Sequence, residues 1–314
     1  MIKKLLKCLY GEYLHYSYKR LYKKNPRLAA IGMYKKIYGK NASLNIDQPE
    51  NLIEKITWLE LNTDTSLWTL CADKYRMREY VEQCQLSDYL PKNYGSWENP
   101  DDIDFDKLPN GFVLKANNGC GTVKIVRDKK TIDEKKIKKE LKRWLKRPFG
   151  YMGAQYHYLP IKPCIIAEEL LPNSDTQSKF SPNSLVDYKV WCFAGKPESI
   201  LIVYDRTSKQ YCLDLYDTNW NRMEDKLNLN GHFEFRKDSL PKPECLTEML
   251  EIASKLSEPF PEVRVDFYIV NDKPIIGELT FSTGYGYFTD EYYKYLGDKC
   301  DISNLKVIKK RIKG

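Results

Sequence analysis

The chain has 314 residues, of which 42% are hydrophobic and 30% are charged, and its formal net charge is +8. This composition excludes a mainly disordered protein, and no charge-free run of about eighteen apolar residues is present to span a bilayer. The amino-terminal segment is basic but lacks the hydrophobic core and cleavage site of a secretory signal, so we expect a cytoplasmic protein.

Nine cysteines are scattered singly along the chain, with no CxxC pair and no zinc-type cluster with the three histidines. We therefore expect free thiols in a reducing compartment and no histidine-rich metal site. No internal repeat or low-complexity tract is present.

Residues 1–40 hold all of the excess positive charge. They contain eleven Lys or Arg residues and one acid, a net charge of +10, whereas the rest of the chain contains 40 basic and 42 acidic residues. Apolar residues from Ile2 to Tyr16 recur at helical spacing opposite Lys3, Lys4 and Lys7, which predicts a basic amphipathic helix. Such a helix either makes peripheral contact with an anionic membrane or packs on its own domain. No recognised nucleic-acid motif accompanies the charge, so we expect no nucleic-acid partner.

From residue 49 the pattern becomes globular. Helices are predicted over 49–62 and 72–86, with Asp73 as the N-cap of the second and Lys74 in its first turn. The segment 93–111 is rich in Asn, Asp, Gly and Pro, which predicts a connecting loop and the first domain boundary.

The rest of the chain is predicted to alternate irregularly between strands and helices, which favours an α+β fold. Two strands flank an Asn-Asn-Gly-Cys-Gly loop, and a highly charged helix follows, whose Lys and Arg residues we interpret as a solvated face. The segment 173–184 is predicted to be a loop. The strands are expected over 111–116, 122–128, 164–171, 185–193, 198–206, 263–270 and 274–281, and the helices over 131–148 and 243–260.

The last predicted hairpin carries two acids that we expect to face each other. With a three-residue loop over 271–273, Asp266 lies opposite Glu278, and Arg264 lies opposite Thr280. Opposed residues of an antiparallel pair share a face, and like charges there are destabilising unless a cation lies between them. Carboxylates of this kind suit Mg²⁺, although a solvated hairpin face is the alternative interpretation.

A second set of residues surrounds the glycine-containing loop. Lys115 ends one predicted strand, and the loop with Gly119 and Gly121 follows it. Main-chain N–H groups of such a loop can bind phosphates, although an ordinary hairpin turn has the same composition. The sequence has no GxxxxGK[ST] motif, so this is not a Walker loop.

Charged residues also interrupt several apolar strands, namely Glu168, Asp187, Lys189 and Arg206. Such groups are rarely buried unpaired, so they require a polar ligand or internal ion pairs. The chain has no GxSxG, HRDxxxxN or strand-following GxGxxG motif, which argues against common hydrolase, protein-kinase and Rossmann functions.

Taken in order, six motifs over residues 72–286 resemble the ATP-grasp superfamily, and most closely its TupA-like branch, which is associated with teichuronopeptide and cell-surface polysaccharide biosynthesis. They are ADKYRMREYV, FVLKANNGCG, IIAEELL, DYKVWCFAGKP, a later DR, and VRVDFY followed by GELTFSTGYG. The resemblance implies two α+β subdomains that clamp ATP. Together with the charge pattern and the predicted loop, it leads us to expect a basic amphipathic arm over 1–48, a helical region over 49–110, a subdomain with the glycine-containing loop over 111–184, and a metal-binding subdomain over 185–314.

The resemblance also implies roles for individual residues. Lys74 and Lys115 would contact the α- and β-phosphates, Asp266 and Glu278 would bind Mg²⁺, and Thr280 stands where the family usually has an asparagine ligand. Cys120 stands where a serine is usual. The remaining implied nucleotide-site residues are Asn118, Gly119, Cys120, Gly121, Glu168, Glu169, Leu171, Asp187 and Lys189, and the implied catalytic residues are Arg206 and Arg264.

The implied reaction is ATP-dependent ligation, in which a carboxylate is phosphorylated and an amine attacks the acyl phosphate. We expect a carboxylate-amine ligase that joins an amino acid or amine to a uronic acid of a cell-surface polysaccharide precursor. One rival is a glycosyltransferase, because residues 102–106 contain DxD-like acids, and another is a non-catalytic nucleotide-binding module.

Overall fold

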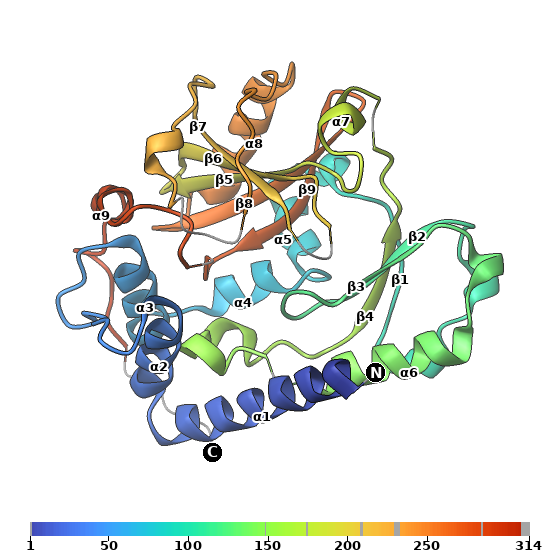
Figure 1. Cartoon of the computed structure of the whole chain (residues 1–314), viewed down its shortest axis with the longest axis horizontal. Helices are drawn as coiled ribbons and strands as arrows, with labels where there is room; N and C mark the ends of the chain where they lie inside the picture. The colour runs from blue at the N-terminus through green and yellow to red at the C-terminus, as the bar shows by residue number, and fades with distance from the viewer. Residues whose placement is uncertain are drawn as a thin grey trace.

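The computed structural model describes residues 2–147, 149–173, 175–207, 210–228, 233–283 and 285–308, with side chains from residue 13 onward except at 175 and 176. Two antiparallel sheets with helices around them form the protein, which confirms the α+β class (Figure 1). The helices are α1 (Ile2–Lys24), α2 (Pro26–Tyr38), α3 (Leu52–Asn62), α4 (Ser66–Ala72), α5 (Met77–Gln83), α6 (Glu134–Lys146), α7 (Asp175–Phe180), α8 (Leu246–Ser257) and α9 (Asp290–Lys299).

The first sheet has the strand order β1-β4-β2-β3, and its neighbours are all antiparallel. Its strands are β1 (Asn93–Trp97), β2 (Phe112–Ala116), β3 (Val123–Val126) and β4 (Ile165–Glu169). Alternation along β2 places Phe112 and Leu114 in a core with Ile137 and Leu141 of α6, so α6 covers one face of this sheet. Lys115 therefore lies on the opposite face.

The second sheet has the strand order β7-β6-β5-β8-β9. Its strands are β5 (Asp187–Phe193), β6 (Lys196–Tyr204), β7 (Cys212–Asp217), β8 (Val263–Val270) and β9 (Lys273–Thr280). Helix α8 packs against β5, β6 and β8, and these elements share the larger hydrophobic core with α3, α4, α5 and α9.

The amino-terminal arm packs on the body of the protein with one side. Tyr18 and Tyr22 of α1 and Ala29 of α2 are buried in the larger core, and the Tyr22 ring makes an edge contact with Tyr151. The packing alternative is thus correct for this side of α1, while Tyr13 is exposed. The predicted apolar stripe from Ile2 to Leu9 lies outside the described side chains. No helix among the described residues has both the length and the apolar character needed to cross a bilayer.

Several local predictions were wrong. Residues 93–111 were expected to be a loop, but β1 begins there at Asn93 and pairs with β4. The expected loop over 173–184 contains α7, and β7 and α9 were not predicted. Asp73 does accept hydrogen bonds from the backbone N–H of Tyr75 and Arg76, but the helix begins only at Met77, so Lys74 lies in the turn before it.

Asp266 pairs with Glu278 in the β8–β9 hairpin as predicted, but the turn and the strand register differ from the predicted ones. The turn has two residues, Asn271 and Asp272, both at positive φ, so Val270 pairs with Lys273 instead of Pro274. A one-residue irregularity at Gly277 restores the register, and Arg264 pairs with Thr280. A Cβ at position 277 would lie 3.1 Å from the Tyr268 ring, which favours glycine there.

Glu262, just before β8, should make the stability of the fold depend on pH. It is 0% exposed, and neither of its carboxyl oxygens has a hydrogen-bond partner among the described residues. Burial raises the pKa of the Glu262 carboxyl well above its ordinary value. The negative charge of Glu60 adds to this rise in pKa, and the positive charge of Arg264 only partly opposes it. The folded protein therefore keeps a proton that the unfolded chain loses above about pH 4.5.

We expect the free energy of unfolding to fall as pH rises from about 5 toward the folded pKa, by up to roughly 1.4 kcal/mol per pH unit. Glu262→Gln should flatten this slope, because the amide cannot ionise. Urea denaturation at pH 5, 6, 7 and 8 measures it, with exposed Glu251→Gln as the control. Equal slopes for wild type and Glu262→Gln would contradict the assignment.

Candidate active site

A buried charge network lies on one face of β5 and β8. Asp266 is 3% exposed and accepts hydrogen bonds from Arg264 Nε at 2.6 Å and Arg264 Nη2 at 2.7 Å. Lys189 of β5, which pairs with Asp266 in the sheet, lies 2.5 Å from Asp266 Oδ2 and 2.7 Å from Asp187 Oδ2. Buried charges cost several kcal/mol each unless they are paired, so this network must be satisfied internally or by a ligand.

Lys74 connects this network to the other sheet. Its Nζ lies 2.8 Å from Glu278 Oε2 and donates to the Gly119 carbonyl in the β2–β3 loop at 3.0 Å. The Lys74 backbone N–H donates to the Asn117 carbonyl, which fixes the turn that carries the lysine. One ammonium group therefore holds the glycine-containing loop beside the β9 carboxylate.

Glu278 remains ionised over the whole physiological pH range. Burial alone would raise the pKa of its carboxyl, but the charges of Lys74, Lys189 and Arg264 outweigh this and hold the pKa far below its ordinary value. Burial raises the pKa of the neighbouring Tyr158 hydroxyl, so that group is a neutral hydrogen-bond donor beside the ion pair. The side chain of Glu278 is 32% exposed, so its carboxylate can also be reached from solvent.

A second ion-pair group lies on the face of the first sheet that α6 leaves uncovered. Glu168 of β4 pairs with Lys115 Nζ at 2.6 Å and with Arg78 Nη2 at 3.0 Å. On the same face, the β3 side chains Val123 and Ile125 are 49% and 53% exposed. A planar apolar ligand with a charged end therefore finds both an apolar surface and a cation here.

The β2–β3 loop depends on its glycines. Gly119 has φ +96°, and a Cβ there would lie 2.7 Å from the Phe149 ring, so only glycine fits. Gly121 has φ +72°, and Asn118 and exposed Cys120 complete the loop. The loop thus has the residues expected of a phosphate-binding segment.

Arg206 and Tyr268 border the network beside Asp187. Arg206 Nη2 lies 3.8 Å from Asp187 Oδ2. The negative charge of Asp187 and burial raise the pKa of the Tyr268 hydroxyl well above its ordinary value. Thr280 Oγ1 accepts from Arg264 Nη2 at 3.2 Å and lies 3.5 Å from Glu278 Oε1.

The structure therefore brings most predicted site residues into two groups. Lys74, Gly119 and the charged residues of β5, β8 and β9 form one, and Lys115 with Glu168 forms the other. Glu169 and Leu171 follow Glu168 along the chain, and Glu169 is exposed. Sequence reasoning missed three residues that contribute here, Arg78, Asn117 and Tyr268, because their partners lie far away in the sequence.

The acids that suggested a glycosyltransferase have local roles. Asp104 accepts a hydrogen bond from the Asp106 backbone N–H and pairs with Lys107 at 3.1 Å. Asp102 accepts a hydrogen bond from the side chain of Asn99. These acids stabilise short turns, and none of these contacts involves either ion-pair group.

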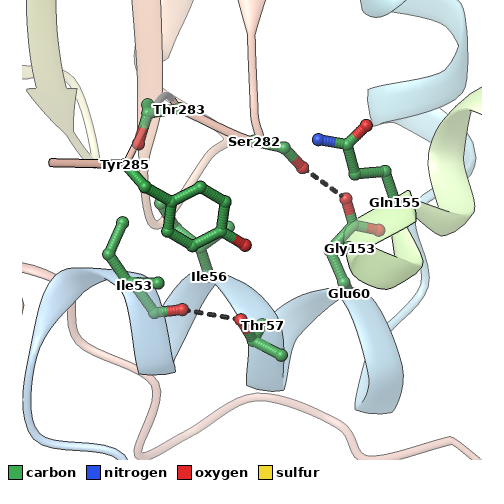
Figure 2. Close-up of a pocket in the computed structure, with 9 residues that line it drawn as sticks. All are labelled: Ile53, Ile56, Thr57, Glu60, Gly153, Gln155, Ser282, Thr283 and Tyr285. Carbon is green, nitrogen blue, oxygen red and sulfur yellow. Dashed lines mark hydrogen bonds between the residues drawn. The ribbon is translucent and has the colours of Figure 1, made fainter. Parts of the chain in front are cut away.

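A small cavity of about 10 Å³ lies between α3 and the segment after β9 (Figure 2). Ser282 Oγ donates to Glu60 Oε1 of α3 at 2.9 Å, and the buried His157 ring contacts the same carboxylate. The cavity has room for about one water molecule, so it is too small to bind a substrate.

The donor set fits a hard divalent cation. Asp266 and Glu278 offer carboxylate oxygens from paired positions on one sheet face, and Thr280 adds a hydroxyl. Within the described part of the chain, no three His, Cys, Asp or Glu side chains are grouped to hold a metal by themselves. Mg²⁺ commonly takes one or two protein carboxylates and completes its shell with phosphate oxygens and water, so two carboxylates suffice.

The TupA-like ATPgrasp family model matches residues 54–301, well over half of the sequence. The chain belongs to the TupA-like ATP-grasp family. The predicted resemblance and the predicted ATP-grasp fold are thereby confirmed, and the two ion-pair groups lie within the matched residues. Comparison with curated protein sequences gives no match.

Solved structures of ATP-grasp ligases are similar to this family member at low identity. D-alanine–D-alanine ligase from Bacillus anthracis complexed with ATP has a TM-score of 0.46 at 16% identity, over 76% of this chain and 67% of that chain. D-alanine–D-alanine ligase from Helicobacter pylori has a TM-score of 0.41 at 13% identity, over 80% of this chain and 66% of that chain. The ATP-grasp ligase PsnB, complexed with a minimal precursor, has a TM-score of 0.40 at 10% identity, over 76% of this chain and 62% of that chain. The TupA-like chain thus spans about two thirds or less of their lengths, and the family assignment depends on the family model.

Asn117 should be required for both the fold and the site. It is 1% exposed, its side chain accepts from Cys164 N at 2.8 Å and donates to Lys162 O at 3.0 Å, and its carbonyl holds Lys74. Asn117→Ala leaves a buried N–H and a partly buried carbonyl without their hydrogen bonds, so we expect a loss of about 2 kcal/mol in the free energy of unfolding.

ATP affinity should fall in the same variant, because the Asn117 carbonyl that holds the Lys74 N–H is no longer fixed by the side-chain hydrogen bonds of Asn117. Urea denaturation and titration calorimetry measure the two effects. Asn219→Ala, at an exposed turn after β7, is the matched control and should change neither. Wild-type stability of Asn117→Ala would show that these hydrogen bonds do not support the turn.

Proposed function

We propose that this TupA-like ATP-grasp protein is an ATP- and Mg²⁺-dependent carboxylate-amine ligase. It attaches an amino acid or amine to a uronic acid of a cell-surface polysaccharide precursor and releases ADP and phosphate. The observation that carries the proposal is the pairing of Asp266 with Glu278 beside Arg264, Lys189 and Lys74, which puts two carboxylates and three cations at one place.

The exposed face of the first sheet supports ATP binding. Val123 and Ile125 offer an apolar surface for the adenine ring, and Lys115 offers a cation for the phosphates. Glu168, Glu169 and Leu171 at the end of β4 would contact the adenine and ribose. Lys74 and the N–H groups of residues 118–121 would hold the triphosphate toward the second sheet.

Asp266, Glu278 and Thr280 would hold Mg²⁺, with Asp187 and Lys189 adjoining them. The ion supplies charge neutralisation for phosphoryl transfer when it is bound. The ammonium groups of Lys74 and Lys189, which contact Glu278 and Asp266, would add positive charge that neutralises the phosphates.

The proposed chemistry needs no side-chain nucleophile. An oxygen of the acceptor carboxylate attacks the γ-phosphorus of ATP, the bond from that phosphorus to the bridging oxygen breaks, and ADP leaves. The amine then adds to the acyl carbon, and the intermediate collapses with loss of phosphate and a proton. Arg264 and Arg206 would stabilise the negative charge that develops on the oxygens during these steps.

We further propose a cytoplasmic protein that contacts the inner membrane face through residues 1–40. The support is the net charge of +10 on these residues and the exposed side of α1. Polysaccharide precursors carried on lipid would present the acceptor there.

Product analysis tests the reaction class directly. ADP and phosphate that form only when both a uronic acid and an amine are present would support ligation. Release of AMP and pyrophosphate would contradict the acyl-phosphate route. Release of UDP from a sugar nucleotide would instead support a glycosyltransferase.

Asp266→Asn and Glu278→Gln should each reduce Mg²⁺-dependent ATP turnover by about 100-fold or more, because each removes a charged metal ligand. A coupled assay for ADP measures the turnover. Circular dichroism separates a folded, inactive variant from an unfolded one, since removal of one partner from a buried ion pair also destabilises the fold. Folded variants with wild-type turnover would remove the metal assignment.

Lys115→Ala and Lys74→Ala should weaken ATP binding by about tenfold to a hundredfold, which is the usual contribution of a hydrogen bond to a charged group. Adenine specificity should remain, because the apolar surface is unchanged. Lys124→Ala is the matched control, since this β3 lysine lies on the opposite face of the sheet and pairs with Glu140. Titration calorimetry with ATP and GTP measures the affinity and the base specificity of each variant. If Lys115→Ala and Lys74→Ala bind ATP as tightly as Lys124→Ala does, the proposed nucleotide site is rejected.

A further inference from the structure

Helix α6 carries a dense positive charge on its exposed side. Residues 134–147 contain eight Lys or Arg residues and two glutamates, a net charge of +6. Ile137 and Leu141 are buried against the first sheet, whereas Lys135, Lys139 and Lys146 are exposed and have no ion-pair partner among the described residues. Like charges along one helix repel each other, so this concentration is unfavourable unless an anionic partner offsets it.

Helix α1 continues this positive charge along the same edge of the protein. The Arg147 side chain donates to His15 Nε2 of α1 at 2.7 Å, so the end of α6 touches α1. Both helices run along the lower edge of the molecule in Figure 1. We call the outward side of these two helices the α1/α6 face. The described exposed residues of these two helices and of Arg147 are Tyr13, Tyr16, Arg20, Lys23, Lys24, Glu134, Lys135, Lys136, Lys139, Lys142, Arg143, Lys146 and Arg147, with one acid among them.

The charge of the protein is strongly divided between this edge and the remainder. Residues 1–40 carry +10 and residues 134–147 carry +6, whereas the remaining chain holds 32 basic and 40 acidic residues, a net charge of −8. Such a division orients a protein in front of a negatively charged surface. The full chain's +8 conceals it.

Exposed aromatic rings accompany the charge on α1. Tyr13 and Tyr16 are 68% and 65% exposed, and they lie on an open surface of α1 together with Arg20, Leu21 and Lys24. Tyrosine rings next to basic side chains suit the boundary between lipid headgroups and acyl chains, where one end of the ring is apolar and the other is wet.

We infer that the α1/α6 face docks on a bilayer that contains anionic lipid, with α6 contributing to binding together with the amino-terminal arm. This extends the membrane contact proposed above from residues 1–40 to a composite surface, and only the choice of a membrane-borne acceptor depends on the proposed function. Because α6 covers one face of the first sheet and Lys115 lies on the other, docking leaves the nucleotide face open.

Vesicle co-sedimentation of the full-length protein tests the inference. Lys139→Gln combined with Lys146→Gln should weaken binding to vesicles of phosphatidylcholine with phosphatidylglycerol by about 25-fold, from roughly fivefold per lysine near an anionic surface. The matched control is Lys242→Gln with Lys255→Gln, two exposed lysines in and beside α8 at the opposite edge of Figure 1. The control should bind as the wild type does.

Binding should also fall as salt rises, since the Debye length is about 8 Å at physiological ionic strength, and it should vanish on pure phosphatidylcholine. Tyr13→Ser with Tyr16→Ser should weaken the part of binding that persists at high salt. An α6 double variant that binds as tightly as the control would overturn the role of α6. Binding to an oligonucleotide that exceeds binding to the anionic vesicles would overturn the choice of a membrane.

Failure of this inference can be separated from failure of the proposed function. The α6 double variant should keep wild-type ATP turnover with a soluble acceptor, because its substitutions lie on the far side of the sheet from Lys115. Asp266→Asn should keep wild-type vesicle binding. Loss of vesicle binding in Asp266→Asn that remains folded would contradict a surface confined to α1 and α6.

Discussion

Inside the second sheet, both carboxylate oxygens of Asp266 accept hydrogen bonds from the guanidinium of Arg264, and Oδ2 also accepts one from the ammonium of Lys189. Three charged side chains that are less than 10% exposed would cost several kcal/mol each if left unpaired. The three groups therefore need strands β5 and β8 in one register only, because a slip of one residue turns each side chain to the other face. Ion pairing here selects the alignment of the sheet on which the candidate site depends.

Gly277 extends the same alignment to Glu278. A two-residue turn alone would place Glu278 one position away from Asp266, and the irregularity at Gly277 corrects this. Lys74 then reaches Glu278 from the turn before α5 and also donates to Gly119. Two sheets that share no strand pairing are thus joined at the site by one lysine, and a ligand that competes for Glu278 would alter the contact with the glycine-containing loop.

Most strands could be predicted from the sequence because apolar residues recur along them, and the acids of β8 and β9 were paired correctly. The pairing was correct because two errors cancelled, a turn one residue too long and an unforeseen bulge. Strand β1 was missed because Asn93 and Gly95 are typical of loops, and only pairing with β4 makes this segment a strand. Asn117 and Arg78 were missed because their partners lie 45 to 90 residues away in the chain.

Successive side chains of a strand point to opposite faces of its sheet, so the first sheet can pack against α6 with one face and present Lys115 on the other. Along β2, Phe112 and Leu114 hold α6, while Lys115 points to the other side. The sequence alone led us to treat the α6 charges as ordinary solvated residues, because the contact between Arg147 and His15 brings together segments 132 residues apart. That contact brings the positive charges of α1 and α6 together along one edge of the protein. The proposed docking surface and the proposed nucleotide face could then be occupied at the same time, because the first sheet lies between them.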